Sequence, residues 1–82
     1  VDNYPNPFTQ STTIRFNTAG GYTLIQIMNT LGQVIATPVD KEFATAGNYT
    51  VVWDAANLAN GVYYARFQNG QVQQVRTMMK VR

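Results

Sequence analysis

The sequence predicts an all-β sandwich, and three observations lead to that prediction. Apolar side chains alternate with a period of two along most of the chain, and no window of about ten residues shows a helical repeat. Turn signals containing glycine or asparagine separate the alternating runs at the spacing of about eight to twelve residues that is typical of sandwiches. The chain has 12% aromatic and 12% charged residues, a balance that favours a packed core over disorder.

Each expected strand follows from its own alternation. The predicted strands are 12–17, 23–29, 34–38, 48–54, 62–68 and 72–81, the last of which is one strand or a pair. We leave open whether 40–43 is a short strand or a loop. The side chains expected to face the core are Ile14, Phe16, Ile25, Ile27, Tyr49, Val51, Trp53, Tyr63, Ala65 and Phe67, whereas Val75, Thr77, Met79 and Val81 share one face of the last strand.

The connections carry their own signals. Gly20-Gly21 and Ala46-Gly47 separate strands, and Asn29 to Gly32 predicts a hairpin with glycine at a positive φ. Asn69-Gly70 is a strong hairpin signal because both residues tolerate the left-handed conformation of a type I′ turn. Residues 55–60 are long enough for one helical turn, capped by Asp54 and stopped by Gly61.

Length and composition restrict the possible classes of function. The 82 residues are one small domain, in which folding buries about 60% of the unfolded surface. The net charge of +2 is too small for a nucleic-acid interface, and no run approaches the roughly 18 apolar residues of a membrane span. There is no cysteine, hence no disulfide or thiol chemistry. The chain starts at Val1 without a signal peptide, so we expect a piece of a longer protein.

The sequence offers no catalytic, metal or cofactor site. Histidine is absent, and Ser11, the single serine, has no neighbour that would activate it. A calcium site could begin at Asp40 with Glu42, or at Asp2 with Asn3, but no oxygen-rich loop completes either pair. We therefore predict a non-catalytic protein without a cofactor.

The opening run Asn3-Tyr4-Pro5-Asn6-Pro7-Phe8 has a clear local meaning. Pro5 and Pro7 fix their own φ, and neither donates to a β-ladder. The segment therefore predicts a turn at the start of the fold or a sheet edge, after which Phe8 enters the core. Two interpretations stay open: a rigid structural segment, or a motif that a partner recognises directly.

Together with two later phrases, Leu31-Gly32-Gln33-Val34 and Leu58-Ala59-Asn60-Gly61-Val62-Tyr63, this run makes the chain resemble a type A C-terminal sorting domain of the bacterial type IX (Por) secretion system. The resemblance covers nearly all of residues 1–82. The positions that match the family's motifs are Pro5, Asn6, Pro7, Gly32, Val34, Gly61 and Tyr63. It implies an immunoglobulin-like β-sandwich of about seven short, mainly antiparallel strands.

The family usually ends in a basic strand. Here Arg76, Lys80 and Arg82 are the candidate recognition residues, and Thr77 stands where a second lysine is common in the family. Half of the six basic residues lie in the last seven positions. An ordinary solubilising edge explains such a cluster equally well.

The resemblance also implies a function. Such a domain lies at the end of a cargo protein that crosses the inner membrane by a separate signal. It is recognised in the periplasm and carries the cargo through an outer-membrane translocon to the cell surface or the medium. A sortase-like protease commonly removes it. The implied partners are the translocon, this protease and the attached cargo.

Two other classes remain open at this stage. A carbohydrate- or matrix-binding module would expose aromatic faces, and the five tyrosines with Trp53 invite that hypothesis. Tyr22, Leu24, Met28 and Tyr64 could form an exposed apolar patch. An immunoglobulin-like spacer, such as a flagellar hook-cap domain with a similar proline-asparagine-proline opening, would lie within a longer chain.

Overall fold

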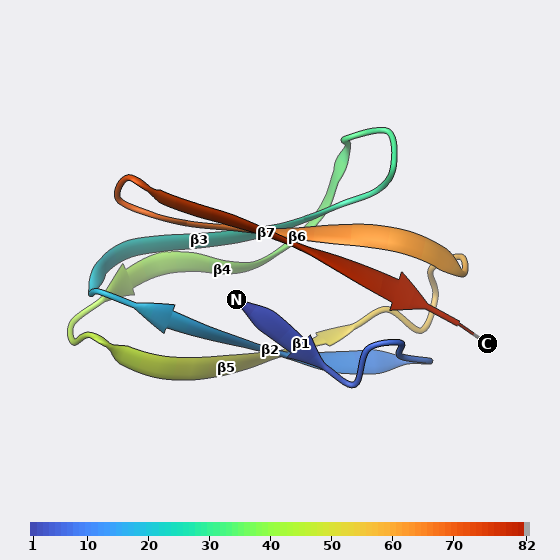
Figure 1. Cartoon of the computed structure of the whole chain (residues 1–82), viewed down its shortest axis with the longest axis horizontal. Coiled ribbons are helices and arrows are strands. Elements are labelled where there is room, and N and C mark those ends of the chain that lie inside the picture. Colours follow the sequence, from blue (N-terminus) through green and yellow to red (C-terminus); the bar gives the residue numbers. More distant parts are fainter. Residues whose placement is uncertain (82) are drawn as a thin grey trace.

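The computed structural model describes residues 1–81, and these form an immunoglobulin-like sandwich of two antiparallel sheets that lie face to face (Figure 1). One sheet has the order β1-β2-β5 and the other the order β4-β3-β6-β7. The strands are β1 (Asp2–Tyr4), β2 (Ser11–Thr18), β3 (Gly21–Met28), β4 (Val34–Phe43), β5 (Gly47–Asp54), β6 (Gly61–Asn69) and β7 (Val72–Lys80). The predicted fold class is therefore confirmed.

The core is formed by the side chains that the alternation in the sequence predicts to face inward. Ile14 and Phe16 of β2 face Ile25 and Ile27 of β3 across the sandwich, and all four are buried. Phe8 and Tyr63 each meet Trp53 edge-on, with ring centroids 5.8 Å apart. A second aromatic cluster joins Phe16, Phe43, Tyr49 and Phe67. The predicted inward faces of β2, β3, β5 and β6 are confirmed.

Strand β4 is longer than predicted. The expected strand 34–38 continues to Phe43, so the segment left open as a short strand or a loop belongs to β4. The register against β3 shifts between Ile25 and Ile27, where Thr37 and Pro38 lie opposite one residue. Because proline lacks the N–H that a ladder needs, a bulge on an edge strand is where it is tolerated. Because the bulge interrupts the alternation of side chains, a period-two pattern does not predict one continuous strand from Val34 to Phe43.

The two hairpin turns confirm one prediction and correct the other. Gly32 has a φ of 80°, and the side chain of Asn29 accepts hydrogen bonds from the backbone of Leu31 and Gln33, as a glycine-containing hairpin requires. At the next hairpin only Gly70 has a positive φ, of 60°. Asn69 instead ends β6 with its side chain buried, an arrangement expected of a type II′ turn rather than type I′.

The connection from β5 to β6 contains no helix. Asp54 does cap the segment, since its side chain accepts a hydrogen bond from the backbone N–H of Ala56 at 3.0 Å. A single turn follows, closed by Leu58 N–H donating to the carbonyl of Ala55. The predicted single turn with its Asp54 cap is therefore present, but its one i→i+3 hydrogen bond makes it an isolated turn and not a helical one.

Candidate recognition surface

The opening motif lies against the last strand. The Asn6 side chain donates to the carbonyl of Thr77 at 3.2 Å and accepts from the N–H of Met79 at 3.1 Å. Two residues later, Phe8 N–H donates to Met79 at 3.0 Å, and Val81 N–H donates to Phe8 at 2.8 Å. Segment 6–8 thus adds to the outer edge of β7 like a short parallel strand, with a bridge between Phe8 and Lys80. The sheet-edge prediction for this segment is confirmed.

A buried polar cluster fixes the start of that segment. The carbonyl of Pro5 accepts hydrogen bonds from the hydroxyl of Thr12 at 2.9 Å and from the amide of Asn3 at 3.4 Å. Asn3 and Thr12 are both buried, and they also bond each other at 3.2 Å. Buried polar groups that are paired in this way resist rearrangement, so Asn6 is held in position to meet β7.

The phrase that contains Gly61 and Tyr63 lies on the other edge of β7. Gly61 pairs with Lys80, and Tyr63 pairs with Met78. The Tyr63 hydroxyl donates to the carbonyl of Ala59 at 2.6 Å, which ties the preceding loop to β6. The C-terminal half of β7 is therefore held between two of the three motifs.

The third motif reaches the same end of the sheet. Val34 pairs with Met28, Met28 with Tyr64, and Tyr64 with Thr77, so one cross-strand row joins all four strands. Figure 1 shows the 29–33 turn, the start of β6 and the end of β7 toward the same side of the molecule. Motifs far apart in the sequence thus gather around the end of the last strand.

The three candidate recognition residues have different positions. Arg76 is exposed, and it pairs with Ala65 on the side of the sheet that faces the shorter sheet. Lys80 is only 6% exposed, and its ammonium donates to the side-chain oxygen of Asn60 at 3.3 Å. Arg82 lies outside the described residues. No local pattern indicates the Lys80–Asn60 contact, because this contact depends on the pairing of β6 with β7.

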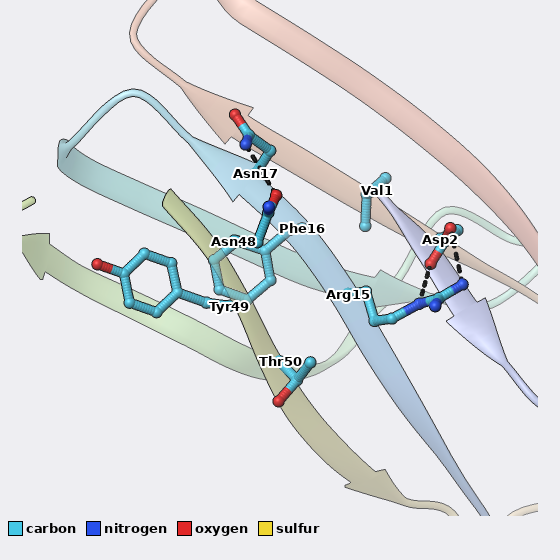
Figure 2. Close-up of a pocket in the computed structure, with 8 residues that line it drawn as sticks. All are labelled: Val1, Asp2, Arg15, Phe16, Asn17, Asn48, Tyr49 and Thr50. Atoms are coloured by element: carbon cyan, nitrogen blue, oxygen red, sulfur yellow. Dashed lines mark hydrogen bonds and ion pairs between the residues drawn. The ribbon is translucent and has the colours of Figure 1, made fainter. Parts of the chain in front are cut away.

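The carboxylates are dispersed over the sandwich. An open hollow of about 540 Å³ lies over β1, β2 and β5. The side chains that line it include the ion pair of Asp2 with Arg15 at 2.9 Å and the hydrogen bond from Asn17 to Asn48 at 2.8 Å (Figure 2). Arg15 already engages both oxygens of the one carboxylate that lines this hollow. The hollow therefore offers a ligand polar and aromatic side chains rather than a catalytic pair.

Elsewhere, the Tyr22 hydroxyl donates to Asp40 at 2.6 Å, and this hydrogen bond raises the pKa of Tyr22 above its ordinary value. The neighbouring negative charge of Asp40 acts in the same direction, since it disfavours the phenolate. Asp40 and Tyr22 lie on the outer face of the four-stranded sheet, where Tyr22, Leu24, Met28 and Tyr64 share the face predicted for them.

The aromatic residues do not form a sugar-binding face. Trp53 and Tyr63 are buried in the core, and Tyr49 packs against it. Tyr4 and Tyr22 are the exposed aromatic residues among those described, and they lie on different sheets. Carbohydrate sites need several accessible aromatic faces on one surface, so this arrangement disfavours the carbohydrate-binding hypothesis.

Fold and motif geometry together define a small β-sandwich module whose sequence motifs gather at one end. The family model described as secretion system C-terminal sorting domain matches residues 2–81, and the chain belongs to this type IX sorting family. Domains of this family are non-catalytic secretion signals that direct proteins to the cell surface or the extracellular space. No curated protein and no solved structure matches the chain. Within residues 1–81 no helix is long and apolar enough to cross a membrane.

Proposed function

We propose that this domain directs an attached cargo protein through the periplasm and across the bacterial outer membrane, and that the type IX translocon recognises the end of the sandwich where the motifs meet. The single observation that carries this proposal is the convergence of Asn6, Phe8 and Gly61 on the C-terminal half of β7. A sortase-like protease that removes the domain, and a surface or released cargo, complete the proposal.

Charge supports the same location. From Ala55 to Arg82 the chain has no acidic residue and four basic ones. Arg76 is exposed and available for steering a partner, whereas buried Lys80 holds the β5–β6 connection through Asn60. We therefore assign direct recognition to Arg76 and the terminal Arg82, and a structural role to Lys80 that keeps the terminal strand in place.

The test is a fusion of this domain behind a reporter that a separate signal exports to the periplasm. In a host with a type IX system we expect the reporter outside the cell, and Arg76→Glu with Arg82→Glu should retain most of it in the periplasm. The matched control is the reversal Arg15→Glu with Lys41→Glu, which makes the same change of charge away from β7. Normal export of the first double variant would contradict recognition at the terminal strand. Retention of the unaltered fusion would contradict the secretory function itself.

A further inference from the structure

The N-terminal half of β7 is an unpaired sheet edge. β7 is the last strand of its sheet, and all residues from Val72 to Thr77 are exposed. Segment 6–8 bonds to Thr77, Met79 and Val81, which therefore direct their backbone groups away from β6. Backbone direction alternates along a strand, so Gln73 and Val75 also point outward. Within residues 1–81 these outward groups have no backbone partner.

Arg76 is the one feature of this edge that protects edge strands in other proteins. Natural sheets protect an edge with charged side chains, proline, a bulge or a covering segment. β4, at the opposite edge of the same sheet, has Pro38 and a bulge. From Val72 to Thr77 the sequence VQQVRT contains no proline, glycine or lysine, and its pairing with β6 is regular. An edge left open in this way is a template for an added strand.

The side chains on the two faces of this edge differ in chemistry. On the outer face Val75 is 61% exposed and pairs with Arg66, and Thr77, the next residue on that face, pairs with Tyr64. On the opposite face lie Gln74, whose side-chain oxygen accepts a hydrogen bond from the Val1 ammonium at 2.7 Å, and Arg76, which is exposed. No acidic residue follows Asp54 in the chain, so Arg76 has no nearby carboxylate on β6 or β7.

We propose, building on the secretory role above, that the Gln73–Thr77 edge of β7 accepts an extended strand from a partner protein. The strand has apolar side chains on the face next to Val75 and an acidic side chain on the face next to Arg76. Main-chain hydrogen bonds to Gln73 and Val75 supply affinity without sequence preference, and the two faces supply specificity. The groups that the partner recognises then belong largely to the backbone of the sorting domain. A translocon that handles many cargo proteins can therefore use the same contact for each.

The first test uses the reporter fusion with Val75→Pro, which removes an outward N–H but no bond to β6. We expect about a tenfold loss of exported reporter, as for a lost strand-addition contact. The matched control is Val52→Pro on β5, an equally exposed valine (65%) at the free edge of the other sheet. Its N–H also points outward, since Ala55 N–H bonds to Gln10, the residue before β2, and direction alternates along the strand. Export of Val75→Pro at the level of the parent overturns the edge assignment and leaves the secretory function standing. Retention of the parent fusion overturns both.

A second test avoids any variant and therefore any loss of fold. The ¹⁵N-labelled chain is titrated with a designed peptide of about eight residues in which valine and aspartate alternate, and with its valine–lysine counterpart. We expect amide shifts and slower hydrogen exchange at Gln73, Val75 and Thr77 with the aspartate peptide alone, weakening as salt is added. Equal binding of both peptides, binding confined to β5, or no shift at millimolar peptide would overturn the proposal.

Discussion

The sandwich has two sides on which the edges of its sheets face each other, and the core is covered differently on each. Where β1 and β7 meet, segment 6–8 closes half of the gap with backbone and side-chain hydrogen bonds, and Phe8 fills the core behind it. Where β4 and β5 meet, no segment covers the described edges, and an open cleft of about 380 Å³ is lined by Phe16, Phe43 and Tyr49. One side is sealed by a motif of the family, and the other is protected by irregularity in β4.

The difference teaches which side has specific requirements. The sealed side depends on residues of fixed type: proline to set the path, asparagine to bond an edge and phenylalanine to fill a core position. The β4–β5 side needs only apolar bulk and a bulge, which many sequences supply. Specific sequence is therefore concentrated where the chain's first and last strands meet, and substitutions on the two sides should have unequal effects.

The largest effect is expected for Phe8→Ala on the sealed side. Phe8 is 1% exposed and packs against Trp53, so its removal leaves a cavity and should lower the free energy of unfolding by about 3–5 kcal/mol. Urea denaturation followed by Trp53 fluorescence measures this. A loss below about 1 kcal/mol would show that the side is not sealed by Phe8.

Tyr49→Ala on the β4–β5 side should cost less, about 2 kcal/mol, because the ring is half-buried and the cleft is already open to water. The ring packs on Phe43 with centroids 4.6 Å apart, and the hydroxyl donates to the carbonyl of Thr45 at 2.8 Å. Tyr49→Phe is the control that separates packing from the hydrogen bond. A loss as large as that of Phe8→Ala would remove the contrast between the two sides.

Asn6→Ala should cost about 1 kcal/mol, since the two hydrogen bonds it removes are exposed and water replaces them. Hydrogen exchange gives the sharper measurement: the amide of Met79 should lose protection, whereas that of Met78, which pairs with Tyr63, should keep it. Unchanged exchange at Met79 would show that Asn6 does not hold the strand edge in solution.

The smallest effect concerns pH and lies away from both sides. The hydrogen bond to Asp40 raises the pKa of Tyr22 in the folded state, so it stabilises the fold below the ordinary pKa of tyrosine. This stabilisation is lost as the pH rises through the raised pKa. A titration of tyrosine absorbance, with Tyr22→Phe as reference, should show one phenol ionising later than a free tyrosine. A Tyr22 that titrates normally would contradict the contact with Asp40.

Local pattern predicted most of the fold and little of the site. Alternation at Ile14, Phe16, Ile25 and Ile27 identified the inner faces, because a strand with one buried face has apolar residues at every second position. Pro38 obscured the length of β4, since a bulge breaks that alternation. The type I′ prediction for Asn69-Gly70 is wrong because only Gly70 takes the left-handed conformation.

The contacts of Asn6 and Lys80 could not be read from the sequence. Asn6 meets Thr77 and Met79 across more than 70 positions of the chain, and Lys80 meets Asn60 only after β6 and β7 pair. A short-range pattern treats both side chains as solvated surface residues. The resemblance to a family singled out these segments without indicating that they touch.

The clasp between segment 6–8 and β7 also imposes an order on folding. A contact with such a long separation in sequence closes a large loop, and loop closure is slow when local contacts do not assist it. Segment 6–8 has no strand edge to pair with until β7 has formed. Until β7 has paired with segment 6–8, Phe8 and the part of the core around Trp53 remain exposed to water. The domain therefore reaches its packed state only when β7 is available, so a chain that lacks β7 cannot complete the core around Phe8.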